Sequence, residues 1–255
     1  MIYLEEGYEI DNRAIIGYDN VANRSTFELA TSEAEGWPGV SVTNPFTYGG
    51  WRPEVSPASI EFGSINKPVD FVGIAAHNLG SLGVSVAIKI NGSTVGVVNP
   101  QDDSSILYLF EERLASSFEL EITYTGSDAP TVTVVSLGKR LTMPHTIYGE
   151  FTPPNLSPKF SLRPQLSEKG KILGRTAIRQ AYTCQPKWDN LNPNWYRQYF
   201  HPFVLAAATI PFFFAWRPND WREEVIYGQT SGNIEPVNNG VRGLMSVEVN
   251  IEGVG

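Results

Sequence analysis

Three histidines, one cysteine and three adjacent glutamate pairs are the residues of this chain whose types suit catalysis or metal binding. His77, His145 and His201 each stand apart from one another and from any cysteine or acidic cluster. A zinc site needs its ligands at short, regular spacings. Cys184 has no motif around it, and a lone cysteine is by default a buried apolar side chain. We therefore expect no metal site and no cofactor.

The glutamate pairs lie at 5–6, 111–112 and 223–224. Two carboxylates can carry out glycoside hydrolysis only where they face each other across a cleft. Adjacent residues of a strand point to opposite faces, so the two carboxylates of each pair would not face each other. The chain also lacks a nucleophile elbow, a phosphate-binding loop and a zinc-protease motif. The sequence predicts a protein that is not an enzyme.

Aromatic and amide residues in predicted loops are candidates for contact with a glycan or a partner protein. Trp37, Tyr48 and Trp51 lie in predicted loops, where their rings could stack on a sugar, while His77 and Asn78 follow a predicted buried strand and could line a pocket at its end. Two alternatives stay open. Trp51 could instead fill the core of the domain, and His77 could instead bond to the backbone.

The stretch 191–221 has the highest density of aromatic residues in the chain. It predicts a helix from about Asn194 to Ala208, opened by a proline in its first turn, and then a strand from Ile210 to Trp216. The helix is apolar around much of its circumference, so it needs cover on more than one side, either from a sheet and the segment 139–165 of its own chain or from a neighbouring subunit. The residues predicted to form an interface between subunits are Arg175, Arg179, Trp195, Tyr199 and Phe203.

Composition excludes several classes of partner. The 255 residues carry a net charge of −8, and a protein that binds nucleic acid needs a basic face. One cysteine permits no internal disulfide, which fits folding in the cytoplasm, and the first residues show no signal peptide. The longest apolar run, Phe203 to Trp216, is interrupted and too short to span a bilayer. We expect neither specific nucleic-acid binding nor membrane insertion.

Short alternating runs organise residues 58–138. They recur at intervals of roughly 8–12 residues with turn residues between them, which is typical of a β-sandwich. One of them, Val84 to Ile90, is followed by Asn91-Gly92, a strong signal for a tight hairpin. Val69 to Ala76 is apolar enough to be a buried strand. Ser25 to Pro57 instead predicts long loops around short strands.

The order of Asn44-Pro45, Trp51-Arg52-Pro53, SIEFG and VDFVGIAAHNLGSLG resembles the galactose-binding-like (discoidin-like) jelly-roll domain, in a variant of phage virion proteins. The resemblance covers about residues 20–140, and its most specific piece is GIAAHNLG, Gly73 to Gly80. It implies a jelly-roll sandwich whose core contains the strand 69–76. Many copies of this fold bind no sugar, so the resemblance favours the fold more than the ligand.

A proline-rich connector, 139–165, precedes the second unit. Its prolines oppose helix, and its aromatic residues suit an arm packed on the second unit better than a solvated linker. Beyond it, Ile172 to Tyr182 predicts a long strand, and Gly243 to Ile251 predicts an alternating closing strand. Strands around one helix form a small α+β unit.

The second unit resembles the tail-tube-like domain of phage tails. The likeness rests on LGRTAIRQ, NPNWYRQYFHPFVLAA, PFFFAWRP, EEVIYG and GLMSVEVNIEGVG. Joined to a β-sandwich, it is similar to the distal tail proteins of long-tailed phages, which form hexameric rings at the end of the tail tube. In this chain the β-sandwich precedes the tube-like unit, which departs from the usual order of that family.

We therefore expect a mainly β protein, with a galactose-binding-like jelly-roll β-sandwich at 1–140 and a small α+β tail-tube-like unit at 141–255. The resemblance implies a structural virion protein, made in the host bacterial cytoplasm and located in the tail. Its partners would be copies of itself in a hexamer and the tube, hub and fibre proteins. The strands 172–182 and 243–251 would pair with those of neighbours. The alternative is a carbohydrate-binding module protein that recognises a host surface glycan.

Overall fold

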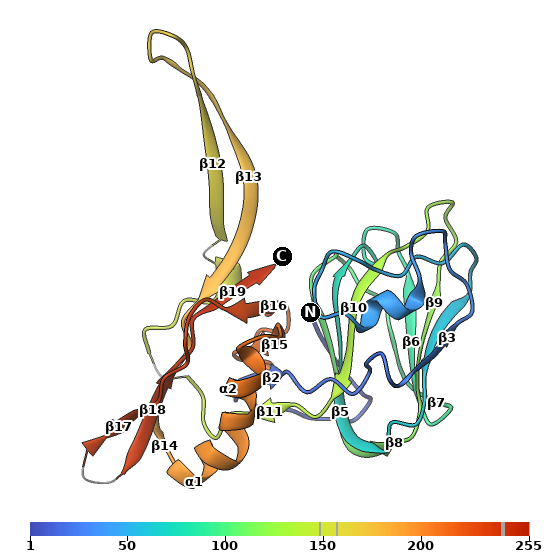
Figure 1. The fold of residues 1–255 in the computed structure, drawn as a ribbon, viewed down its shortest axis with the longest axis horizontal. Coiled ribbons are helices and arrows are strands. Elements are labelled where there is room, and N and C mark those ends of the chain that lie inside the picture. The colour runs from blue at the N-terminus through green and yellow to red at the C-terminus, as the bar shows by residue number, and fades with distance from the viewer. Residues whose placement is uncertain (148, 157, 241–242, 255) are drawn as a thin grey trace.

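The computed structural model describes residues 1–147, 149–156, 158–240 and 243–254, and the side chains of 155, 178–180 and 254 lie outside the description. The chain is mainly β, with two bodies side by side and one continuous helix (Figure 1). This confirms the predicted fold class. No helix within the described residues is long and apolar enough to cross a membrane.

The first body is a β-sandwich of two sheets. The four-stranded sheet has the order β1 (Ile2–Leu4), β8 (Ile106–Ala115), β5 (Lys67–His77), β10 (Val132–Gly138). The five-stranded sheet has the order β3 (Phe27–Ala30), β4 (Ala58–Phe62), β9 (Phe118–Thr123), β6 (Ser85–Ile90), β7 (Ser93–Val98). A short 3-10 helix, η1 (Gly39–Thr43), follows β3 in sequence. Apolar residues from both sheets meet in one buried cluster.

Local sequence accounts for the sandwich strands. In β6, Val86, Ile88 and Ile90 alternate with half-buried residues, so one face enters the core and the other meets solvent. The predicted turn after β6 forms, with positive φ at both Asn91 and Gly92, as a tight hairpin turn requires.

The second body is built on a seven-stranded sheet and a three-stranded sheet. The larger sheet has the order β11 (Leu141–Thr142), β2 (Ile15–Gly17), β15 (Phe212–Ala215), β16 (Val225–Thr230), β19 (Ile251–Val254), β13 (Ile172–Cys184), β12 (Pro158–Leu166). The smaller has the order β14 (Lys187–Leu191), β18 (Leu244–Glu248), β17 (Val237–Asn239). Because β2 belongs to the larger sheet, the chain enters the second body before it builds most of the first. The predicted division at residue 140 stays a prediction.

One helix runs from 193 to 207, as predicted to within a residue. It consists of α1 (Pro193–Trp195), a π-helical segment, η3 (Tyr196–Phe200), and α2 (His201–Ala207). The Asn192 side chain caps the start by accepting a hydrogen bond from the Asn194 N–H at 2.8 Å. The wider π turn precedes Pro202, whose ring and missing N–H do not fit a regular α turn.

The predicted closing strand Gly243–Ile251 is wrong as a single strand. It is two strands, β18 and β19, in different sheets, and the chain passes from one sheet to the other at Val249-Asn250. Both are inner strands: β18 lies between β14 and β17, and β19 between β16 and β13. Their hydrogen-bonding edges are therefore occupied within the chain, which contradicts the expected edge pairing with a neighbour.

The connector also differs from the prediction. Phe151 packs against Phe214 and Trp216, as expected of an arm docked on the second unit. After a short 3-10 turn, η2 (Pro154–Leu156), however, residues 158–166 form the nine-residue strand β12. Pro158 and Pro164 are tolerated because β12 is the edge strand of its sheet, where an N–H is dispensable.

A third apolar cluster joins the two bodies. It is made by the outer face of β5 and its neighbours and by β15 and β16. The Phe213 ring lies over Gly73, where an added Cβ would be only 2.4 Å from a ring carbon. The Tyr227 hydroxyl donates a hydrogen bond to the Pro45 carbonyl at 2.6 Å. This seam explains why β5 is buried on both faces.

Candidate functional site

The β12–β13 hairpin is the part of the molecule with the least support from its own chain. It leaves the second body and projects away from both bodies (Figure 1). Every residue of β12 is exposed except half-buried Pro158. The two strands pair with one another from Pro158–Tyr182 to Leu166–Ile172, with register shifts after Ser161 and after Gln165. A two-stranded hairpin alone is marginally stable in water.

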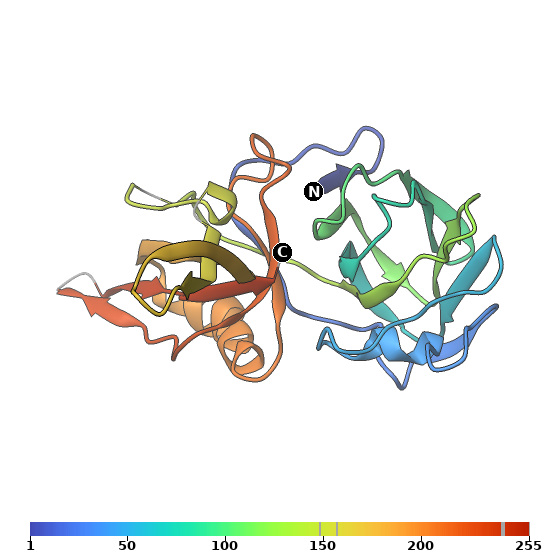
Figure 2. The same ribbon diagram turned by 90° about the horizontal axis from the view of Figure 1, so that it is seen from above.

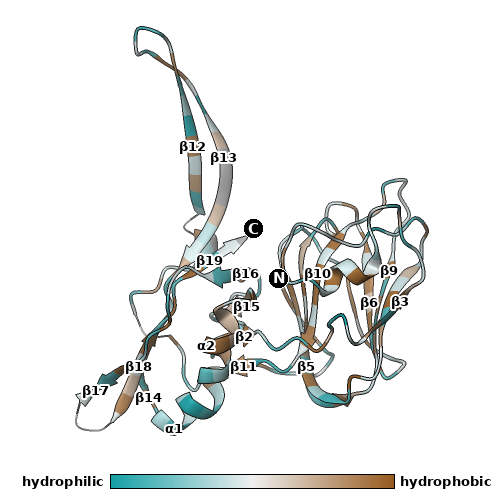
Figure 3. Ribbon diagram, in the orientation of Figure 1, coloured by the Kyte–Doolittle hydropathy of each residue, from teal (hydrophilic) through white to brown (hydrophobic). Residues whose placement is uncertain are grey.

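Side chains alternate along β12. Phe160, Leu162 and Leu166 point to one face, and Lys159 and Arg163 to the other. Ile172 lies directly opposite Leu166 and shares its face. We call Phe160, Leu162, Leu166 and Ile172 the apolar strip. Their exposed fractions are 49%, 42%, 57% and 81%, respectively. Figure 3 shows apolar positions alternating with polar ones along this strand.

Charge is distributed unevenly between the hairpin and the rest of the chain. Residues 158–184 contain six basic residues and one acidic residue, a net charge of +5. Because the whole chain carries −8, the remaining residues carry −13. The hairpin is therefore a basic projection on an acidic protein, and an acidic surface would attract it.

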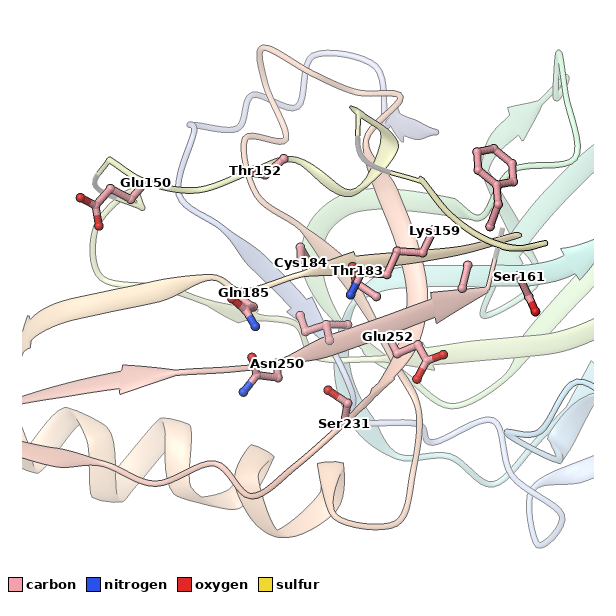
Figure 4. A pocket seen from close by; sticks show the side chains of 13 residues that line it. Glu150, Thr152, Lys159, Ser161, Thr183, Cys184, Gln185, Ser231, Asn250 and Glu252 are labelled. Atoms are coloured by element: carbon pink, nitrogen blue, oxygen red, sulfur yellow. The ribbon is translucent and has the colours of Figure 1, made fainter. Parts of the chain in front are cut away.

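A cavity of about 640 Å³ lies at the base of the hairpin. Figure 4 shows side chains from the hairpin base, the connector and β19 around it. Within the described residues, the Asn250 side-chain oxygen is buried there without a hydrogen-bond partner. Cys184 also lines it, and burial raises the pKa of this thiol to about 12. The thiol is therefore protonated at neutral pH and is not a nucleophile.

A second cavity of about 550 Å³ lies at the seam between the two bodies. His77, Asn78, Asp102 and Asp103 line it from the sandwich, and Tyr227 lines it from β16. The structure thus brings together His77 and Asn78 of the predicted glycan-binding set. Figure 2 shows the two bodies side by side, viewed from above.

His77 uses both ring nitrogens within the protein. Its Nδ1 accepts a hydrogen bond from the Leu79 N–H at 3.3 Å, so its Nε2 carries the hydrogen and donates to the Ser104 carbonyl at 3.0 Å. Burial lowers the pKa of His77 to about 4. The side chain is neutral at pH 7 and holds the loop before β8. His77 therefore bonds to the backbone, which was one of the two alternatives left open by the sequence.

Three other candidates for glycan contact lie apart from that histidine. Trp51 is fully buried in the sandwich core, and its Nε1 donates to the Ser32 carbonyl at 2.7 Å. Its ring is therefore inaccessible to a sugar in this structure. Trp37 is exposed, and Tyr48 is 83% exposed. The Tyr48 hydroxyl accepts a hydrogen bond from the Asn44 side chain at 2.6 Å.

The predicted interface residues fall in different environments. Arg175 is exposed on the hairpin, and Tyr199 is exposed on the helix. Trp195 is half-buried against the second core. Phe203 is fully buried and packs edge-on against Phe212, with 4.9 Å between the ring centroids. It is therefore a core residue and cannot reach a neighbouring subunit. The side chain of Arg179 lies outside the described residues.

Sequence reasoning missed β12, the longest element of the connector. The prolines of 139–165 favoured irregular structure, whereas the alternation K-F-S-L-R-P-Q-L over 159–166 was the available signal. Within the described residues, no group of three or more histidine, cysteine or acidic residues is placed to hold a metal ion.

Comparison with known proteins finds no matching family model and no matching curated sequence. Among solved structures, chitosan-binding module 1 from a chitosanase/glucanase of Paenibacillus sp. IK-5 is 17% identical, with a TM-score of 0.40. The alignment covers 47% of this chain and 98% of that module. The family 32 carbohydrate-binding module of C. perfringens NanJ, in complex with galactose, is 14% identical, with a TM-score of 0.39 over 50% of this chain and 99% of that one.

A Ruminococcus gnavus GH29 fucosidase in complex with fucose is 11% identical, with a TM-score of 0.41 over 49% of this chain and 27% of that enzyme. The two binding modules correspond in kind to the carbohydrate-binding alternative, the fucosidase is an enzyme, and none of the three is a phage tail protein. Their TM-scores all lie below 0.5, so the likenesses carry no inference about the ligand of this chain.

Proposed function

We propose that this chain is a structural assembly protein without catalytic activity, which joins copies of itself through the β12–β13 hairpin. The observation that carries the proposal is the exposed apolar strip. Burial of a large apolar side chain is worth roughly 1.5–3 kcal/mol. A projecting strip of four such residues is costly in water unless a partner covers it.

The open edges of the hairpin add a second reason. β12 has no strand on its outer side, and β13 pairs with β19 only at Tyr182–Cys184. Among the described residues, the β13 edge from 172 to 181 is therefore unpaired on that side. Exposed edges recruit other strands unless charge or proline blocks them. Pro158 and Pro164 weaken the β12 edge, whereas residues 172–181 of β13 contain no proline. The strand 172–182, one of the two expected to pair with a neighbour, therefore has a free edge in a single chain.

The biological setting in this proposal is a bacteriophage tail. The resemblance of the second unit to tail-tube-like domains favours a ring at the distal end of the tube, with tube, hub and fibre proteins as neighbours. In that setting the protein is located in the virion tail. The acidic sandwich faces outward and attaches tail-tip or receptor-binding components.

The test measures the mass of the purified full chain across a range of concentrations, with negative-stain imaging of any assemblies. We expect oligomers and closed rings from the wild type. The triple variant Phe160→Ser, Leu162→Ser, Ile172→Ser should remain folded and stay monomeric. A matched control is Leu114→Ser on β8, which removes an exposed leucine from the sandwich and should assemble normally. Wild-type protein that stays monomeric at high concentration would contradict the proposal.

Carbohydrate recognition is the second candidate, and the seam cavity favours it. Concave sites that combine an apolar wall with a few polar groups are the usual form of a small-molecule site. The test is glycan-array binding by wild type, Asn78→Ala and Tyr48→Ala, with circular dichroism to establish folding. Binding that is lost in Asn78→Ala alone would locate the sugar in the seam cavity. Absence of binding to every glycan by folded wild type would remove this candidate.

A further inference from the structure

The strongest unexplained feature outside the hairpin is an acidic surface on the sandwich. It consists of Glu33, Glu35, Trp37, Glu54 and Val55, all exposed, and we call it the acidic patch. Trp37 and Val55 are large apolar side chains left in solvent. The patch therefore combines apolar contact area with three carboxylates.

Backbone hydrogen bonds hold the two segments of the acidic patch together. The Ala34 N–H donates to the Arg52 carbonyl at 2.7 Å, and the Arg52 N–H donates to the Trp37 carbonyl at 3.3 Å. The Ser32 hydroxyl accepts from the N–H groups of Glu54 at 2.9 Å and Val55 at 3.2 Å. A surface fixed in this way needs little ordering when a partner binds.

The patch and the apolar strip are complementary in chemistry. The strip is apolar and lies on a hairpin of net charge +5, whereas residues 28–55 carry four acidic residues and one basic residue. Arg175 lies directly opposite Pro164 and so shares the face of the strip. Its planar guanidinium suits both a carboxylate and an indole face. Trp37 and Glu35 offer these two groups.

One chain cannot bring the two surfaces together. The patch lies in the loop between β3 and β4, and the part of that loop that meets the second body is Pro45 to Thr47, which does not include the patch residues. The hairpin points away from the sandwich (Figure 1). Contact between the strip and the patch therefore requires two copies.

We infer that the apolar strip of one copy docks on the acidic patch of a second copy. This inference rests on the proposed function and names the receiving surface. The interface is head-to-tail, because the two contributing surfaces differ, and such interfaces close into rings or grow into filaments. In such an assembly the sandwich of each copy supplies the surface that receives the hairpin of the next copy.

The experiment reverses charges on each side and recombines them. Lys171→Glu with Arg175→Glu changes the hairpin, and Glu35→Lys with Glu54→Lys changes the acidic patch. Glu6→Lys with Glu9→Lys is the matched control, since it alters two exposed carboxylates in the segment between β1 and β2, outside the patch. Association is measured by sedimentation of the full chain at about 150 mM salt. We expect each test variant to weaken association at least 10-fold, and the control less than 2-fold.

Two recombinations decide the pairing. A chain that carries both sets of reversals should regain association to within about 3-fold of wild type. An equimolar mixture of the hairpin variant and the patch variant should assemble with the two variants in alternation, because the native hairpin meets the native patch at one contact and the reversed hairpin meets the reversed patch at the next.

The outcomes separate this inference from the proposed function. If the hairpin variant dissociates while the patch variant assembles like wild type, the hairpin binds a surface other than the acidic patch. The inference is then overturned and the assembly proposal stands. If neither variant changes association, the assembly proposal fails as well. If wild type binds duplex DNA at the same salt concentration and Lys171→Glu with Arg175→Glu abolishes that binding, the hairpin serves a nucleic acid and the inference is overturned.

Discussion

Strands β6 and β12 have the same alternating sequence pattern and opposite surroundings. In β6, Val86, Ile88 and Ile90 are buried in the sandwich core, and Lys89 on the other face contacts Glu119 and Glu121 at 2.9 and 3.0 Å. In β12, Phe160 and its alternate neighbours face solvent. The pattern fixes which residues share a face, but the rest of the molecule determines whether anything covers that face.

The largest effect should separate the two strands directly. Ile88→Ala should lower the free energy of unfolding by about 2–5 kcal/mol, because it leaves a cavity in a packed core. Leu162→Ala should change monomer stability by no more than about 0.5 kcal/mol, and its effect should appear in association. Urea unfolding measured at a concentration below that of assembly tests both. A loss above 2 kcal/mol for Leu162→Ala would mean that the hairpin is supported within one chain.

The next effect concerns pH and the loop that His77 holds. Its pKa is about 6.5 when unfolded and about 4 when folded, so the unfolded state binds more protons between these values. The free energy of unfolding should therefore fall as pH falls from 6.5 to 4, by on the order of 2–3 kcal/mol. Among the described residues no buried histidine contacts the hairpin, so the loss should come from the sandwich.

The His77→Gln variant isolates this contribution. Burial raises the pKa values of Asp19 and Asp70, which acts in the opposite direction on stability. The quantity to measure is therefore the difference in unfolding free energy between wild type and His77→Gln at each pH. A difference that stays constant from pH 7 to pH 4 would contradict the buried neutral state of His77.

The seam between the bodies should respond to a smaller change. Gly73→Ala places a Cβ against the Phe213 ring and should cost about 1–3 kcal/mol through overpacking. The control is Gly232→Ala, where no atom lies within 4 Å of the added carbon. Differential scanning calorimetry measures both. Equal melting temperatures for the two variants would show that the Phe213 ring moves aside without loss of stability. The packing of the second body on the outer face of β5 would then be looser than its burial implies.

The smallest expected effect compares the polar faces of the two strands. Lys89→Ala removes a partly buried contact with two glutamates and should cost up to about 1 kcal/mol. Arg163→Ala on β12 removes an exposed side chain that has no hydrogen-bond or ion-pair partner among the described residues, and it should leave unfolding by urea unchanged. A stability loss for Arg163→Ala as large as that for Lys89→Ala would place the polar face of the hairpin against its own chain.

Local patterns predicted much of the fold. The Asn91-Gly92 turn, the buried strand β5 and the helix at 193–207 follow from turn chemistry, apolar run length and capping. The prediction was wrong where one segment serves two sheets. Alternation continues through Val249-Asn250, so nothing local indicates that β18 and β19 part there.

The candidate surfaces were predicted less completely than the fold. His77 and Asn78 do share a cavity, but its far wall comes from β16, about 150 residues later in the chain. Residue type alone could not separate Trp51, which fills the core, from exposed Trp37. Both are tryptophans followed by a proline within two residues, and they differ in where the folded sandwich places them.

The sequence by itself determined the alternation of β12, the single helix, the charge of the hairpin and the absence of recognised catalytic motifs, because these depend on residue type and spacing along the chain. Tertiary structure alone decided that β5 is covered on both faces and β12 on neither. Burial depends on which distant segments arrive against a face, and the seam formed by β15 and β16 arrives at β5. Nothing in the described chain arrives at the apolar strip, and for that reason we look to a second copy.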